Sequence, residues 1–241
     1  MFFGNNEKGK SLLRLASSLV KKQKENANIT AMHMILSDEM HSYNMDEYET
    51  DSFLPIINES KILDQKISTV FKATVDIESD IVDIANQGEY DLLLVGLGKS
   101  IFEGTLLGKV LGFTTRIINP DRLIDKFTGK EGLFENSPSD ERTRQIISKT
   151  KMPLGILINK DLQNVNRVFI PIFSAEDGFL LDYAQKLIYN NDSKIAVLDC
   201  NGQIKNNFII ENAVDSLENN YPSNMSLLTN KVIEKEFLNQ H

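Results

Sequence analysis

The sequence predicts an α/β fold with an open parallel sheet and helices on both faces, in two repeats of which the second is incomplete. Three observations support this prediction. Apolar, strand-like segments alternate with amphipathic helical segments, which is typical of parallel sheets. The acidic Tyr90-Asp91 is followed by an apolar run without alternation, so 91–95 is expected to be a central strand buried on both faces. Residues 168–200 then repeat the pattern found at the beginning of the chain.

The first repeat supplies the clearest elements. Apolar residues at the spacing i, i+3, i+4, i+7, i+8 from Leu12 mark an amphipathic helix, and the lysines that follow suit the negative end of its dipole. The acidic segment 38–51 is interpreted as a solvated loop rather than a cation-sensing or docking segment. In chain order, the pattern predicts a helix over 12–20, a strand over 29–36, a helix over about 52–64, a strand over 67–74, a helix around 77–85, the strand 91–95, a helix from Ser139 to Lys151 and a strand over 154–158.

An insertion at about 101–137 interrupts this order. Residues 104–113 are compatible with a helix, whereas 117–137 contain glycines and a proline and fit no element. The part over 101–118 is rich in apolar side chains, including Phe102 and Leu106. This part either completes the core or forms a surface for dimerisation or docking.

The second repeat begins after a polar boundary at 159–166. Residues 180–188 overlay the first helix, 12–20, without gaps. The strand predicted in front of it, 168–173, has a counterpart in the first repeat that is shortened to Met1-Phe2-Phe3. Two more strands are expected over 195–200 and 225–230, and no counterpart of 91–98 follows. The domains are therefore predicted as 1–160, including the insertion, and a shorter repeat over 167–241.

Composition excludes several classes of function. The net charge of −8 and the pI near 5.0 argue against binding to nucleic acid or to anionic lipid. A single cysteine, Cys200, excludes an internal disulfide and fits a reducing compartment. No segment approaches the roughly 18 apolar residues of a membrane span, and the chain begins without a signal-peptide pattern. We expect a soluble, cytoplasmic chain, which leaves open a tether to something larger.

No arrangement typical of catalysis or metal binding is found in the sequence. It has no Gly-x-Ser-x-Gly, no metal-spaced histidine pair and no Cys-x-x-Cys, so we expect no enzymatic activity. The segment Met32-His33-Met34 contains soft ligands, but strand alternation sends the two methionines to one face and the histidine to the other. Core methionines are therefore expected, and no metal site.

The glycine-rich turn after residues 91–95 is the main candidate for a binding site. It contains Gly96, Gly98, Lys99 and Ser100. Backbone N–H groups and the lysine would form a cradle for a phosphate or another anion; alternatively, the glycines only permit a tight turn. A Walker A loop is excluded, because Leu93 stands where that motif needs glycine.

The residues Tyr90–Gly96, the segment Ala31-Met32-His33-Met34 and the end of the last helix at Lys151-Met152-Pro153 resemble the universal stress protein family, in tandem. This resemblance covers most of residues 1–160 and, more weakly, 167–241. It implies an open five-stranded parallel sheet, of the adenine nucleotide alpha hydrolase-like class. It also implies that ATP or AMP would bind at the ends of the first and fourth strands, beside Asn5, Asn6 and Met34 as well as the glycine turn.

Several positions depart from the ATP-binding pattern of that family. Gly96 and Gly98 are separated by one residue instead of two, and Lys109 stands after Gly108 where a hydroxyl is expected. Alternatively, the insertion separates the two halves of the motif. Gly4-Asn5-Asn6 replaces the acidic residue that often follows the first strand. Each departure weighs against ATP and leaves another anion open.

The segments Gly98–Val110 and Arg116–Pro120 are similar to the cytoplasmic C-terminal region of bacterial monovalent cation:proton (sodium/proton) antiporters. This similarity implies a regulatory domain tethered to the cytoplasmic face of the inner membrane. Its partners would be the membrane antiporter domain, in the same polypeptide, and a second copy in a homodimer. The alternatives are a ligand-free dimerisation scaffold of the transporter and a stand-alone nucleotide-binding stress protein.

Overall fold

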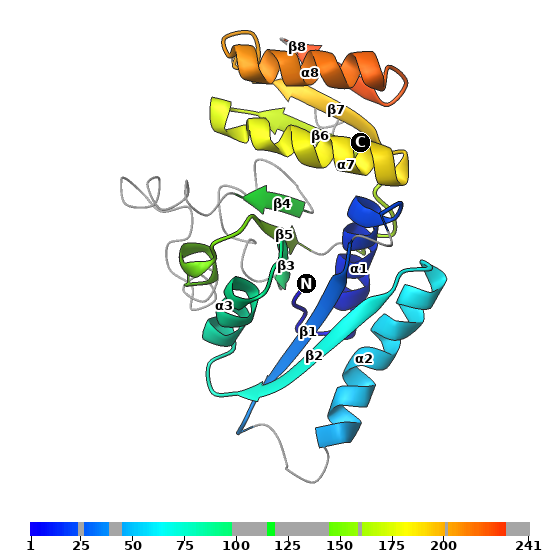
Figure 1. Cartoon of the computed structure of the whole chain (residues 1–241), viewed down its shortest axis with the longest axis vertical. Coiled ribbons are helices and arrows are strands. Elements are labelled where there is room, and N and C mark those ends of the chain that lie inside the picture. The colour runs from blue at the N-terminus through cyan, green and yellow to red at the C-terminus, as the bar shows by residue number, and fades with distance from the viewer. Residues whose placement is uncertain are drawn as a thin grey trace. The chain divides into compact units, whose positions relative to one another are not determined.

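The computed structural model describes residues 1–23, 27–38, 45–97, 115–118, 145–158, 161–200 and 202–229. The chain forms two compact units (Figure 1). Unit 1 contains Met1–Ala16 and Asn28–Gln163, and unit 2 contains Ser17–Ala27 and Asn164–His241. Within the described residues, no helix combines the length and the apolar character needed to cross a bilayer.

The sheet of unit 1 consists of two groups of strands. In the first, β1 (Ile29–Leu36) pairs in parallel with β2 (Ile67–Thr74), in the register Ile29 to Ile67. In the second, β5 (Leu154–Ile158) pairs in parallel with β3 (Leu93–Leu97). On its other side, β5 pairs in antiparallel with β4 (Thr115–Ile118). The unit is therefore an open, mainly parallel sheet, as predicted, with one antiparallel strand from the insertion.

The segment Met1–Phe3 joins the two groups. Phe2 forms parallel bridges to Met32 of β1 and to Val95 of β3. Its N–H donates to Leu94 O at 2.8 Å, and its carbonyl accepts from Gly96 N at 3.3 Å. The shortened first strand of the prediction thus lies in the middle of the sheet.

Helices cover both faces of this sheet. Helix α1 (Asn6–Val20) packs against α2 (Met45–Ile62), because Gly9 lets Ile56 and Phe3 approach its backbone closely. The opposite face carries α3 (Ile77–Gln87) and the helical residues 145–149. Their buried side chains form one cluster with β1, β3 and β5, and this cluster includes Met32 and Met34. Figure 1 shows α2 running alongside β1 and β2.

Some boundaries differ from the prediction. The acidic segment is not a loop throughout, because α2 begins at Met45 rather than near 52 and its first turn carries Asp46 and Glu47, where carboxylates suit the positive end of the helix dipole. The central strand is Leu93–Leu97 rather than 91–95. The predicted helix over 104–113 and the start of the helix at Ser139 lie outside the described residues.

Unit 2 repeats the same order on a smaller scale. Its strands pair in parallel in the order β6 (Arg167–Ile172), β7 (Lys194–Asp199) and β8 (Met225–Thr229). A 3-10 helix, η3 (Ala175–Phe179), leads into α7 (Leu180–Asn191), and α8 (Phe208–Asn220) connects β7 to β8. These elements match the strands predicted over 168–173, 195–200 and 225–230 to within one residue at each end.

Unit 2 also contains the end of α1 and the turn after it. The side chain of Asn190 is 2% exposed and joins the end of α1 to α7. Its Nδ2 donates to Leu19 O at 2.7 Å and to Lys186 O at 2.9 Å, and its Oδ1 accepts from Lys22 N at 2.9 Å. A single buried amide of α7 therefore provides partners for two backbone groups at the C-terminal end of α1, Leu19 O and Lys22 N.

Candidate anion-binding site

The carboxyl ends of Met1–Phe3 and β3 are neighbours in unit 1, because Phe2 bridges to Val95 in parallel. From Phe3 the chain passes through α1 to β1 on one side of this segment, whereas β3 lies on its other side. In open α/β sheets, ligands bind outside the carboxyl ends of the strands where the strand order reverses in this way. The candidate site is therefore at this edge, and we call it the switch-point site: Asn5, Asn6, Lys8 and Gly96.

Asn5 caps the helix α1, which begins at this site. Its Oδ1 accepts a hydrogen bond from Lys8 N at 3.0 Å, and its carbonyl accepts from Gly9 N at 3.0 Å, so α1 begins at Asn6. The remaining N–H groups of the first turn have no partner within a helix and lie at the positive end of its dipole. This arrangement favours an anion in front of Asn5 and Asn6.

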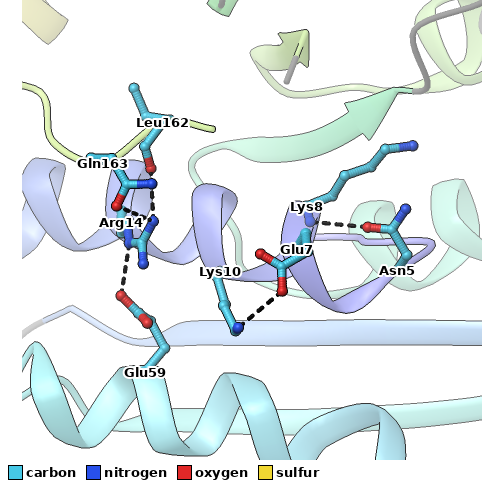
Figure 2. A network of polar contacts seen from close by, with 8 residues as sticks. All are labelled: Asn5, Glu7, Lys8, Lys10, Arg14, Glu59, Leu162 and Gln163. Carbon is cyan, nitrogen blue, oxygen red and sulfur yellow. Dashed lines mark hydrogen bonds and ion pairs between the residues drawn. The ribbon is translucent and has the colours of Figure 1, made fainter. Parts of the chain in front are cut away.

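Lys8 adds a full positive charge beside these N–H groups. Its stem packs over Gly96, since a Cβ added at Gly96 would lie 3.3 Å from Lys8 Cβ and 3.2 Å from Leu12 Cδ1. Partial burial lowers the pKa of the Lys8 ammonium, and no carboxylate of the described chain pairs with it. Figure 2 shows the Lys8 side chain extending away from Glu7 and Lys10. A bound anion would compensate this desolvated charge.

The acidic residue in the first turn does not cancel this charge. Glu7 Oε1 lies 3.0 Å from Lys10 Nζ, in a pair between residues i and i+3 (Figure 2). The pair is exposed and contributes little to stability. The pair nevertheless directs the Glu7 carboxylate toward Lys10, and the ammonium of Lys10 offsets the negative charge of Glu7.

The other predicted site residues divide into two groups. Gly96 lies in β3 at the site, whereas Gly98, Lys99 and Ser100 lie outside the described residues. Met34 is 3% exposed and belongs to the hydrophobic cluster under α3, on the face opposite α1. The site therefore contains Asn5, Asn6 and Gly96 of the predicted set, and Met34 serves the core instead.

His33 holds Phe3, the residue that leads into the switch-point site. It lies in an aromatic group with Phe3, Phe53 and Phe71, and its ring centroid is 5.0 Å from that of Phe3. Its Nδ1 lies 2.9 Å from Phe3 O, which can only accept, so Nδ1 carries the proton. His33 thereby orients the last carbonyl before Gly4. Its position opposite Met32 and Met34 confirms the predicted alternation.

Lys8 was not among the residues predicted for the site. Its contact with Gly96 is tertiary, so neither spacing nor composition reveals it. The one signal in the sequence is that Lys8 stands three residues after a potential N-cap, Asn5.

The corresponding edge of unit 2 is already occupied by a carboxylate of the chain. Asp177 Oδ2 accepts hydrogen bonds from the N–H groups of Phe173 and Ser174, both at 2.9 Å. These are the N–H groups that follow β6, as Gly4 and Asn5 follow Phe3 in unit 1. Asp177 therefore takes the place where an external anion would bind. Burial, followed by the charges of Asp199 and Asp177, raises the pKa of the neighbouring Cys200 thiol.

Comparison with known proteins identifies this architecture. The sequence matches no protein-family model and no curated protein. The structure is similar to the crystal structure of a universal stress protein from Archaeoglobus fulgidus DSM 4304, with a TM-score of 0.50 and 12% sequence identity. The match covers 95% of this chain and 75% of that chain. The fold is that of a universal stress protein.

This result confirms the fold implied by the sequence resemblance. Counted along the chain of unit 1, Met1–Phe3, which makes only the isolated bridges at Phe2, stands in the place of a first strand, and β3 is the fourth. The resemblance implied a ligand at the ends of these two strands, and the switch-point site lies at these ends. The universal stress protein fold is shown by the structure alone, since the sequence identity is low.

Proposed function

We propose that this chain is a regulatory module that binds a small phosphate-bearing anion, such as an adenine nucleotide, at the switch-point site. The observation that carries this proposal is the convergence of the capped N-terminus of α1, the Lys8 ammonium, which pairs with no carboxylate of the described residues, and the close approach allowed by Gly96. Backbone N–H groups and one desolvated cation suit a phosphate better than a neutral or cationic ligand. The proposed role is binding without catalysis.

Calorimetric titration tests this binding. The probes are ATP, ADP, AMP, a cyclic dinucleotide and inorganic phosphate, each added to the whole chain. Lys8→Met keeps the aliphatic stem over Gly96 and removes the charge, so we expect at least about tenfold weaker binding. Lys10→Met is the matched control, because it removes one charge from the same helix at a side chain already paired with Glu7. The absence of binding by every probe contradicts the proposal.

A second variant tests anion binding without disturbing the fold. Asn5→Asp retains an acceptor for Lys8 N and therefore retains the cap, and an aspartate also suits a helix N-terminus. It places a negative charge where the anion would lie. We expect unchanged thermal stability and loss of anion binding. Full binding by Asn5→Asp would exclude the helix N-terminus as the site.

We further propose that the module belongs to the cytoplasmic side of a monovalent cation:proton antiporter. This part is supported by the sequence similarity of Gly98–Val110 and Arg116–Pro120, most of which lie outside the described residues. A ligand would act by binding one of two arrangements of the module more tightly. The test is the genomic reading frame upstream of residue 1. A series of apolar spans of about 20 residues supports the proposal, and their absence contradicts it.

Association between two copies is the remaining part of the proposal. The segment 101–118, rich in apolar residues and described only over β4, would hold two antiporter protomers together. Light scattering of the chain measures its mass directly. A dimer that becomes monomeric on changing Phe102 and Leu106 to Asp supports this role, and a monomeric parent chain contradicts it.

A further inference from the structure

Arg14 joins three segments of unit 1 through one guanidinium group (Figure 2). Its Nε donates to Glu59 Oε1 of α2 at 2.7 Å. Its Nη1 donates to Leu162 O at 3.0 Å and to Gln163 Oε1 at 3.1 Å. We call Leu162 and Gln163 the connector, because they are the last two residues of unit 1 before unit 2 continues at Asn164.

The pair with Glu59 is largely removed from water. The side chains of Arg14 and Glu59 are 20% and 10% exposed. A charge pair buried to this extent holds its geometry, because either partner left alone would be a desolvated charge. The connector is different: Gln163 is exposed and Leu162 only half-buried, so few apolar contacts hold it. The guanidinium therefore connects a firmly held carboxylate to a loosely packed stretch of backbone.

A separate set of contacts holds the chain immediately after the connector. Val165 is buried, and its carbonyl accepts from Asn191 Nδ2 at 3.1 Å and from Ser193 Oγ at 2.5 Å, all within unit 2. Asn164, exposed, lies between this anchor and the Arg14 contacts. With the Arg14 contacts formed, only Asn164 lies between residues that hydrogen bonds hold. Without them, Leu162 and Gln163 also lose these hydrogen bonds.

We propose that Arg14, held in place by Glu59, fastens the connector to α1 and α2 reversibly. We call this set of contacts the strap. When its hydrogen bonds to Leu162 and Gln163 break, the connector detaches while unit 1 stays folded. The planar fork of the guanidinium is what makes one side chain serve both Glu59 and the connector. The strap concerns residues distinct from the switch-point site and does not depend on any ligand there.

Nuclear magnetic resonance relaxation of the whole chain tests the strap. Arg14→Lys keeps a cation for Glu59 but loses the fork, so unit 1 stays folded and the connector is released. We expect backbone order parameters for Leu162 and Gln163 to fall from about 0.85 to below about 0.6, with Val165 unchanged. Gln163→Ala removes one of the two connector contacts and serves as the matched partial variant, with a smaller fall.

A second pair of variants separates the strap from the stability of the unit. Arg14→Met alone leaves Glu59 buried without a partner and should lower the folding equilibrium constant roughly hundredfold or more. Arg14→Met with Glu59→Leu removes both charges, so most of this stability should return while the connector remains free. Ordered Leu162 and Gln163 in either folded variant, Arg14→Lys or the double variant, would overturn the proposal.

Discussion

Two buried side-chain amides differ in how well their hydrogen-bonding groups are satisfied. Asn190 uses both ends of its amide, in three hydrogen bonds. Gln65 is 5% exposed, and its Oε1 is buried without a partner in the described part of the chain, while its Nε2 makes one long bond of 3.3 Å to Lys66 O. A buried acceptor left unpaired costs free energy, whereas a paired amide recovers its desolvation.

This contrast predicts opposite results of replacing each amide by an apolar side chain of similar size. Gln65→Met should leave the free energy of unfolding within about 1 kcal/mol of the parent or raise it, because an unsatisfied oxygen is removed. Asn190→Leu should lower it by about 2 kcal/mol or more, because Leu19 O and Lys22 N lose the partner that the buried amide provides. Urea denaturation followed by circular dichroism measures both. Equal losses in the two variants would contradict this account.

Gly96 gives a second prediction at the scale of single residues. Gly96→Ala should destabilise unit 1 by about 1–3 kcal/mol, because the new Cβ meets Leu12 Cδ1 and Lys8 Cβ at distances tighter than normal packing. Gly4→Ala is the control, since nothing lies within 4 Å of a Cβ there, and its effect should stay within about 0.5 kcal/mol. Thermal unfolding distinguishes them. A neutral Gly96→Ala would mean that α1 is not pressed against β3.

Helix α3 shows how a single cap defines an element. Asp76 Oδ1 accepts from Ser79 N at 3.0 Å, with Asp76 in an extended conformation, and α3 begins at the next residue. Asp76→Ala should cost about 0.5–2 kcal/mol, whereas Asp76→Asn retains an acceptor and should cost far less. Hydrogen exchange in the first turns of α3 reports the change locally. Similar exchange in both variants would show that the helix start is set by packing instead.

The elements also show which parts of the fold could be predicted from sequence. The strands β1, β2 and β5 have the predicted bounds, because β1 and β5 are apolar runs that are largely buried and β2 alternates along its length. The start of α2 could not be found, since Pro55 favours a helix start near 52 and the first turns are acidic and exposed. Four-residue β4 owes its existence to antiparallel pairing with β5, which no local pattern records.

The candidate site was predictable only in part. Gly96 is predicted because a glycine after a buried strand is visible in the sequence, whereas Asn5 enters only through the family resemblance. The role of Lys8 depends on its packing over Gly96, a tertiary contact that strand and helix periodicity do not contain. For Met34, the resemblance implied a place beside the ligand whereas strand alternation predicted a core methionine, and the structure agrees with the alternation.

At the scale of the whole molecule, the 241-residue chain with a free α-amino group at Met1 buries this group, which makes the stability of that chain depend on pH. Burial lowers the pKa of this amine from 8.0 to about 5, although it donates to Thr30 O at 2.6 Å. Between these two values the unfolded chain binds more protons than the folded chain, so the free energy of unfolding rises with pH across this window. The full effect is at most about 4 kcal/mol, from three units at about 1.4 kcal/mol each.

The measurement is the urea midpoint of the 241-residue chain at several pH values between 5 and 8. The midpoint should increase across this range and level off near pH 8. A chain acetylated at Met1 has no titrating amine and is the control, in which this part of the pH dependence should vanish. An identical slope in the two chains would contradict the assignment to Met1.

The three residues Met1–Phe3 also bear on the cooperativity of unit 1. They form the described link between the pair β1–β2 and the group β3–β5–β4, and their hydrogen bonds run to Met32 on one side and to Leu94 and Gly96 on the other. If this link opens, each part of the sheet keeps its own strand pairing but loses its neighbour. Opening of these three residues, a local event in most sheets, would here divide one cooperative transition into two.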